Sequence, residues 1–495
     1  MKTSFRRWAI LSCALLVALG LLALWWMGPQ VARTDTPPDF EALAAQQGRV
    51  DAWYRLQGDR LPPALPQHRE IATPASVRPL TYGDTLTHAV YLPLIRREGR
   101  VFPTYERRAL WVTRFDWTRY NEPPHPAAID ALVANAAHAG FNTLFFQVRA
   151  TGDAYYSSTL EPWAARLTGS LTETLGQDPG WDPLARMIST AHASGLEVHA
   201  YVNVYPTWAG ETPPPKAITP THPFWAWSHA DYADWPPEAE DQWAAWRQWN
   251  SAGHPMNLNP GYLWASPGVD LVRDHIVAVV EDLVTSYPVD GIHLDLVRYA
   301  NVDYSYDPLS NAAAGEVKTA ARDRWQRDRV TDLVARIMTA TRATRPDAWV
   351  TAAVWPYYED RWGWGVRTGY EHLYQDSKGW LAEGVVDGVA PMLYGDGASI
   401  PDDLAKWETL AADFLAHAAG RHVYPGVGAY YTDFVEIEAR IWSARALGAP
   451  GHVLFSYSAL EAHDYWDELA AGPYAQPAEI PPRPTGTDIR LSSTD

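Results

Sequence analysis

Polar side chains end several neighbouring apolar segments of this sequence, in a pattern suited to acid–base chemistry. In segment 289–297 the apolar side chains alternate, so His293 and Asp295 share the opposite face. A carboxylate on an inward face is costly unless it is paired or used, which makes Asp295 a candidate catalytic residue. A structural ion-pair network of Asp295 with Arg149 and Arg298 is the alternative interpretation. The same alternation turns inward the polar residues of segments 143–149 and 197–203, which are Gln147, Arg149, His199, Tyr201 and Asn203.

Two further acids are candidates for a second catalytic carboxyl group. Glu359 directly follows an aromatic run at 355–358, and an apolar shell raises the pKa of a carboxyl group, as a general acid requires. Asp376 is ambiguous, because it could simply cap a helix over 371–383.

Apolar segments of strand length alternate with helical periodicity, and this alternation positions the polar residues. An α/β fold is expected, namely a (β/α)8 TIM barrel over 106–470, whose chemistry lies at the C-terminal ends of its strands. A doubly wound open sheet is the alternative, although no glycine fingerprint for a dinucleotide follows the first strand. The predicted strands are 109–115, 143–149, 197–203, 289–297, 349–355, 386–394, 422–428 and 452–457. The predicted helices are 126–138, 183–194, 269–286, 320–344, 371–383, 402–417, 433–447 and 459–470.

The N-terminus carries a membrane signal. Basic residues precede an apolar run over 8–27 that is long enough to span a bilayer, so 1–27 is predicted to be an uncleaved anchor. A cleaved signal peptide is the alternative, and either one exports the rest of the chain. Residues 28–105 are predicted to be a proline-rich stalk with a lead-in strand. Residues 471–495 are predicted to be a disordered tail.

Composition excludes several function classes. The net charge of −18 makes a nucleic-acid partner unlikely, because phosphate binding requires basic surfaces. The single cysteine allows neither a disulfide within the chain nor a zinc–thiolate site, and no metal or cofactor motif is found. The 25 tryptophans suit sugar faces, and many of them lie in the insertion 204–268 after the third strand. We therefore expect Trp208 and Trp264 to bind glycan, the alternative being that these indoles pack into a lid with its own small core.

The sequence resembles the glycosyl-hydrolase-like 10 family over about residues 107–460. The matching stretches occur in the family's order at 108–113, 140–149, 195–203, 257–261, 289–299, 374–380, 386–394 and 455–457. The resemblance implies a TIM-barrel glycoside hydrolase of the bacterial envelope, similar to enzymes that cleave peptidoglycan glycan strands lacking stem peptides. Asp295 matches the acid that ends the fourth strand, and Asp376 also falls on a family acid. The tryptophan-rich insertion departs from the family pattern.

A membrane-anchored glycoside hydrolase outside the cytoplasm is the leading hypothesis, with an envelope polysaccharide as substrate and no metal or cofactor. Asp295 would be the nucleophile or charge stabiliser, kept ionised by Arg298 or Arg149. Glu359, ahead of Asp376, would be the acid/base. The alternatives are a glycan-binding barrel without activity and a protein-docking role for the indole loop. The expected substrate-binding residues are Gln147, Arg149, Asn203, Asn259, Arg298, Trp355, Tyr394 and Tyr457.

Overall fold

The computed structural model describes residues 94–97, 100–170, 172–228, 244–394, 403–431 and 433–484, and within them the α/β class is confirmed. A parallel sheet of nine strands forms the centre, in the order β11-β10-β9-β8-β5-β4-β3-β13-β12. These strands are β3 (Arg107–Val112), β4 (Thr143–Arg149), β5 (Glu197–Asn203), β8 (Gly291–Asp295), β9 (Trp349–Val354), β10 (Gly388–Pro391), β11 (His422–Val423), β12 (Gly426–Gly428) and β13 (Gly451–Phe455).

The two ends of this sheet meet in one short segment. β11 pairs with β10 and β12 pairs with β13, although both belong to the continuous segment 422–428. Between them, the Tyr424 amide donates to the Val389 carbonyl (2.9 Å) and the Val453 amide donates to the Pro425 carbonyl (3.2 Å). The sheet is therefore curled, and the fold is TIM-barrel-like.

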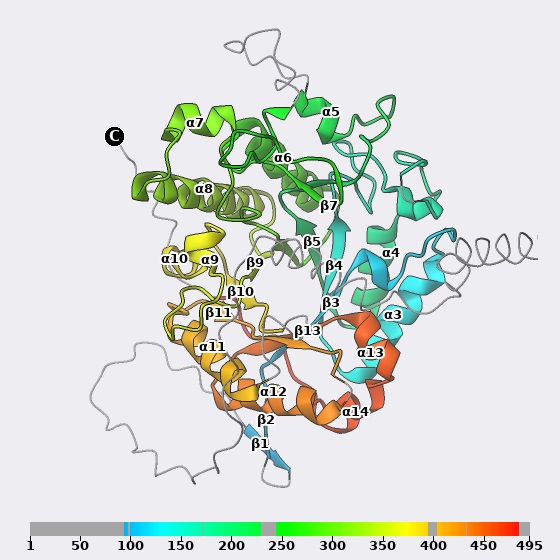
Figure 1. Ribbon diagram of the computed structural model, residues 1–495. Coiled ribbons are helices and arrows are strands. Elements are labelled where there is room, and N and C mark those ends of the chain that lie inside the picture. The colour runs from blue at the N-terminus through cyan, green and yellow to red at the C-terminus, as the bar shows by residue number, and fades with distance from the viewer. Residues whose placement is uncertain are drawn as a thin grey trace, which may run out of the picture.

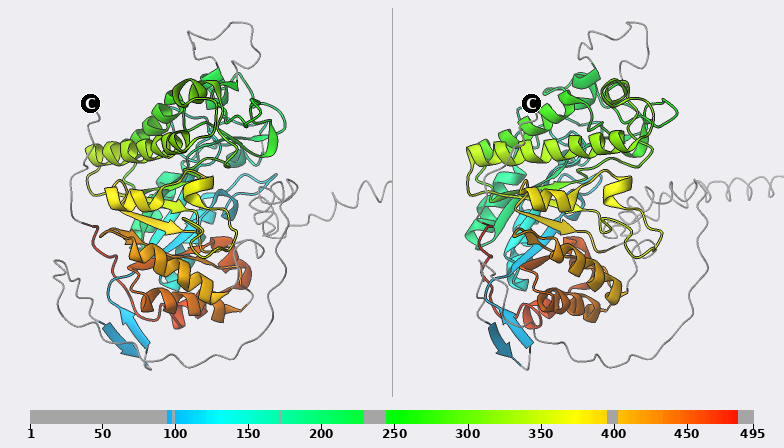
Figure 2. Two further views of the ribbon diagram at one scale, coloured as in Figure 1. Left: turned by 60° about the vertical axis from the view of Figure 1, so that its left-hand side comes forward. Right: turned by 90° about the vertical axis from the view of Figure 1, so that its left-hand side faces the viewer.

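Helices surround this sheet in each interval where the hydrophobic periodicity predicts one (Figures 1 and 2). Their ends follow capping rules: α3 stops at Gly140, whose φ of 92° is left-handed, and the Asp182 side chain accepts from the Ala185 amide in the first turn of α4. The main helices are α3 (Pro126–Ala139), α4 (Pro183–Ala193), α6 (Asp270–Ser286), α8 (Ala320–Thr344), α10 (Ser377–Glu383), α11 (Leu404–Ala416), α12 (Phe434–Ala446), α13 (Tyr457–His463) and α14 (Trp466–Ala471).

Side chains alternate along β8 as the sequence indicates. Ile292 and Leu294 pack in the apolar layer beneath the helices. His293 points into the sheet's interior, where its ring stacks on Phe145 with centroids 4.0 Å apart. Asp295, two residues further on, is on this same inward face.

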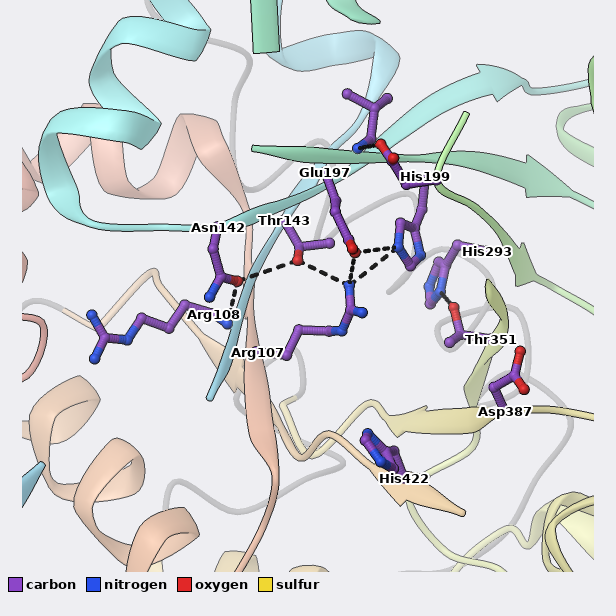
Figure 3. A network of polar contacts seen from close by, with 12 residues as sticks. Arg107, Arg108, Asn142, Thr143, Glu197, His199, His293, Thr351, Asp387 and His422 are labelled. Atoms are coloured by element: carbon purple, nitrogen blue, oxygen red, sulfur yellow. Dashed lines mark hydrogen bonds and ion pairs between the residues drawn. The ribbon is translucent and has the colours of Figure 1, made fainter. Parts of the chain in front are cut away.

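The N-terminal ends of the strands are tied together by a buried polar network around Arg107 (Figure 3). One guanidinium nitrogen, Nη1, donates to Glu197 on β5 (2.8 Å) and to Thr143 on β4 (2.9 Å), and lies 3.1 Å from His199 Nε2. The guanidinium also stacks over Trp349 on β9, 4.3 Å from the ring centroid. A structural polar network therefore occupies the N-terminal ends of the strands, and the candidate active site lies at their C-terminal ends.

The tryptophans of the insertion after β5 are more buried than we expected. It contains the antiparallel pair β6 (Pro206–Gly210) and β7 (Asn259–Trp264) and the short helix α5 (Pro223–Ser228). Trp208 and Trp264 are only 3% and 4% exposed, and the Trp208 ring nitrogen donates to the Thr212 carbonyl. The other buried indoles are Trp227, Trp246 and Trp249. Trp208, Trp227, Trp246 and Trp264 belong to the main hydrophobic core, so Trp208 and Trp264 do not present the exposed rings that we expected for a sugar platform.

The chain segments before and after the barrel-like domain are described only in part. β1 (Leu94–Arg97) and β2 (Arg100–Pro103) form an antiparallel pair. Glu479 pairs with the backbone at Thr104 and Glu106, so this part of the predicted tail packs on the domain. The predicted anchor over 1–27 lies outside the described residues. Among the helices that are described, none is long and apolar enough to cross a membrane.

Candidate active site

Asp295 ends β8 and is held by two short hydrogen bonds. The Tyr201 hydroxyl on β5 donates to its Oδ2 (2.6 Å), and the Leu296 amide donates to its Oδ1 (2.6 Å). Leu296 has a φ of 51°, so the chain turns sharply directly after the carboxylate. Burial raises the pKa of Asp295, while both hydrogen bonds and the charge of Arg298 oppose that rise. The carboxylate is therefore fixed in position and carries a perturbed pKa, as catalytic acids often do.

Aromatic rings line the interior beside this carboxylate. Tyr394, just after β10, stacks on Phe455 with centroids 4.9 Å apart and meets Trp111 edge-on at 5.6 Å. Burial raises the pKa of the Tyr394 hydroxyl, and the negative charge of Asp295 adds to that rise. The predicted substrate-binding residue Tyr394 thus lies within electrostatic range of Asp295.

Arg298 is sandwiched between two indoles. Its guanidinium carbon lies 5.0 Å from the ring centroid of Trp264 and 5.3 Å from that of Trp355, and Nη1 donates to the Tyr299 carbonyl (3.1 Å). Trp355 is half-buried, with its ring nitrogen bonded to the Arg367 carbonyl. Arg298 therefore connects the insertion, the loop after β9 and the surroundings of Asp295.

Gln147 positions a residue that the sequence analysis overlooked. Its Oε1 accepts from the backbone amide (2.9 Å) and Nη1 (3.3 Å) of Arg114, which follows β3. Arg114 in turn donates through Nη2 to the Tyr262 hydroxyl on β7 (3.2 Å). Gln147 therefore attaches the loop after β3, and through it the insertion, to the end of β4. The predicted strand 109–115 included Arg114, whereas β3 ends at Val112, so the sequence did not mark Arg114 as a residue after a strand end.

Arg149 does not pair with Asp295. Its Nε and Nη2 bind Glu161 at 2.8 to 3.0 Å, and both side chains are fully buried. Its Nη1 donates to the carbonyls of Asn203 and Val204. The Asn203 side-chain amide is likewise used internally, donating to the Ala150 carbonyl (3.1 Å). Arg149 therefore pairs with Glu161 and not with Asp295, contrary to the predicted role of keeping Asp295 ionised, while substrate binding by Arg149 and Asn203 stays a prediction.

The side chains of Tyr457 and Asn259 also form hydrogen bonds within the protein. Tyr457 begins α13 and is buried, and its hydroxyl accepts from Asn135 of α3 (2.9 Å) and donates to Glu461 (3.2 Å). Its hydroxyl is thus held by two side chains of the helix layer, and its role in sugar binding stays a prediction. Asn259, at the start of β7, is half-buried and donates to the Asn257 carbonyl (2.9 Å).

Glu359 and Asp376, the predicted second carboxyl groups, both follow β9 and lie in different surroundings. Glu359 is exposed on the loop after β9 and lacks the apolar shell expected for a general acid. Asp376 caps α10 by accepting from the Gly379 amide (2.9 Å), and it also accepts from the Tyr358 hydroxyl (2.7 Å). In the described part of the chain, no hydrogen bond or ion pair joins either acid to Asp295.

Asp116 is an acid at a strand end with a more suitable environment. It lies in a short turn after β3 and accepts from the amides of Thr113 (2.5 Å) and Ser458 (3.1 Å). Burial raises the pKa of Asp116 to about 6, although these hydrogen bonds oppose the rise. Such a carboxyl is protonated in part near neutral pH, as a general acid must be.

Comparisons with known proteins show which family and which fold the chain resembles. The model of the family described as Glycosyl hydrolase-like 10 matches residues 106–432. The chain is 28% identical to Glycosyl hydrolase YngK of Bacillus subtilis (strain 168), covering 77% of this chain and 74% of that protein. It is 26% identical to Glycosyl hydrolase DigH of Escherichia coli (strain K12), covering 61% and 69%. The glycoside hydrolase domain of PgaB (BpsB) from Bordetella bronchiseptica shares the fold, with a TM-score of 0.50, 14% identity and coverage of 74% and 98%.

Proposed function

Because the chain belongs to the glycosyl hydrolase-like 10 family, we propose that it cleaves glycosidic bonds in a bacterial envelope polysaccharide, specifically peptidoglycan glycan strands without stem peptides. The observation that carries the proposal is Asp295, held by Tyr201 at the C-terminal end of β8 beside aromatic rings. Relatives named glycosyl hydrolases support the reaction class. The curled sheet supports an eight-stranded (β/α)8 barrel, in which this end of the strands carries the chemistry.

In the proposed mechanism, Asp295 acts on the anomeric carbon as nucleophile or stabilises the oxocarbenium-like transition state. The Tyr201 hydrogen bond fixes its position, and the positive charge of Arg298 favours its ionised form. The second carboxyl group protonates the leaving oxygen. Asp116 has the pKa that this task requires, and Asp376 matches a family acid. Of the two, Asp116 is the stronger candidate, because Asp376 is already used as a helix cap.

The proposal also retains the membrane anchor over 1–27, with the barrel outside the cytoplasm. A basic start followed by an apolar run supports it. Fractionation with protease access tests it, because a protease-protected barrel in intact spheroplasts would exclude export.

The function is tested by measuring new reducing ends released from denuded peptidoglycan strands by the full-length protein. Release supports the proposed hydrolase. Retention of the strands in a pull-down without any release would instead support a glycan-binding barrel without activity. If the strands were neither cleaved nor retained, the polysaccharide assignment would be overturned.

Replacing Tyr201 by phenylalanine is expected to move the acid limb of the kcat/KM–pH profile to higher pH. The hydroxyl stabilises ionised Asp295, so its loss raises the pKa of that carboxyl and leaves less of it ionised at acidic pH. Hydrogen bonds to charged groups contribute about 1.5–3 kcal/mol, so kcat/KM below neutral pH should fall about tenfold or more.

Tyr287→Phe is the matched control, because it removes another tyrosine–aspartate hydrogen bond, to Asp182, outside the site. It should leave the shape of the profile unchanged. An equal loss of Tyr201→Phe activity at every pH would mean that Tyr201 supports only the packing.

A further inference from the structure

The loop after β9, residues 355–368, lies next to the candidate active site. All strands of the central sheet are parallel, so this loop leaves the same end of the sheet as Asp295. Its first residue, Trp355, contacts Arg298, and the charge of Arg298 acts on Asp295. The loop is thus continuous with the surroundings of the carboxylate.

Two indoles of this loop stack on each other; Trp362 is exposed and Trp364 is half-buried. The rings of Trp362 and Trp364 are nearly parallel, with an interplanar angle of 22° and centroids 4.8 Å apart. Trp362 is 37% exposed, more than any other tryptophan that the structure describes. Since the other described indoles are buried or half-buried, this stack is an unusual use of a large apolar side chain on a surface.

The loop that carries the stack is held in place before any ligand binds. The Asp360 carboxylate accepts from the amides of Trp364 (2.7 Å) and Gly365 (2.8 Å). Arg361 forms an ion pair with Asp413 on α11, and Lys406 of the same helix lies 5.0 Å from the Trp364 ring centroid. A platform fixed in this way loses little conformational entropy on binding.

We propose that Trp362 and Trp364 form a sugar-binding platform that holds a glycan chain extending from the site of Asp295. This inference rests on the proposed function and adds a subsite to it. Flat indole faces suit the C–H faces of pyranose rings, and a polar edge remains for water and hydroxyls. The guanidinium carbon of Arg361 lies 5.8 Å from the Trp362 ring centroid, so a hydrogen-bond donor for sugar hydroxyls is next to the platform. The buried tryptophans of the insertion cannot take this role, because their rings are covered.

The test compares Trp362→Ala with its parent in the full-length Asp295→Asn protein, so that bound strands are not cleaved. Affinities are measured for long denuded peptidoglycan strands and for their disaccharide fragments. Loss of one aromatic contact should weaken long-strand binding about three- to tenfold, with a smaller effect on the fragments. Trp362→Phe keeps a ring and should restore part of the affinity. Leu447→Ala is the matched control, because Leu447 is equally exposed at 37% but lies after α12, at the opposite end of the strands.

The outcomes separate this inference from the function on which it rests. Unchanged affinity of Trp362→Ala for long strands, in a protein that hydrolyses them with Asp295 intact, would overturn the platform alone. No binding and no hydrolysis by the parent would overturn the function. A change in oligomeric state on Trp362→Ala without loss of glycan affinity would show that the stack contacts a second copy, and would also overturn the platform.

Discussion

Asparagine at position 295 is expected to reduce hydrolysis of denuded glycan strands at least about a thousandfold while the protein stays folded. The substitution is nearly isosteric: the side-chain oxygen of the asparagine can still accept from the Leu296 amide, and its NH2 group can donate to the Tyr201 hydroxyl oxygen. It removes the negative charge that a nucleophile or charge stabiliser must supply. Release of reducing ends and the midpoint of thermal unfolding are the two measurements.

Asp303→Asn is a suitable control, because Asp303 follows the same strand but is exposed to solvent. It should retain the parent's rate. If Asp295→Asn were within about threefold of the parent, Asp295 would not be the catalytic carboxylate. Because burial raises the pKa of Asp295, the parent itself should lose activity on acidification earlier than an ordinary aspartate would allow.

Much of this site can be predicted from the sequence, because apolar and polar side chains alternate along the strands. Apolar Ile292 and Leu294 face the helices, so the inward position of His293 and Asp295 follows from strand geometry alone. The positions of the strands and helices could be predicted for the same reason, because each apolar segment has the period of its element. That a side chain faces inward does not reveal its hydrogen-bond or ion-pair partner, so the partners of the inward residues could not be predicted.

Partners and exposure depend on tertiary contacts that periodicity does not contain. Glu161 was one of many acids after strand ends, and only the path of the loop after β4 brings it to Arg149. Trp208 and Trp362 both lie in connections that follow a strand of the central sheet, yet Trp208 is buried and Trp362 is exposed. Glu359 follows aromatic residues in the chain, but its side chain points to solvent. In loops, the adjacent residues in the sequence therefore do not predict which residues surround a side chain.

Alanine at position 161 is expected to lower the free energy of unfolding by about 3–5 kcal/mol, because it leaves the buried Arg149 guanidinium without its counter-charge. The Glu161 carboxylate binds Arg149 through both oxygens and also contacts His275 (2.9 Å). Urea unfolding at neutral pH measures the loss. Asp130→Ala is the control, because its ion pair with Arg186 is exposed and should contribute little. A loss for Glu161→Ala no larger than for this control would mean that water or another acid replaces the carboxylate.

The pH dependence provides a second, independent check on the Glu161 pair. Burial opposes ionisation of Glu161, but Arg149 and His275 outweigh it and lower the pKa to about 2 from an ordinary value of 4.5. A group whose pKa is lower in the folded state stabilises the fold above its unfolded pKa, and that contribution is lost as the pH falls towards the folded value. The parent should therefore be most favoured over Glu161→Ala above about pH 4.5, and the difference in unfolding free energy should shrink as the pH approaches 2. A difference that stayed constant over this range would show that the lost stability comes from packing of the side chain, and the ion pair would then not be the source of the stabilisation.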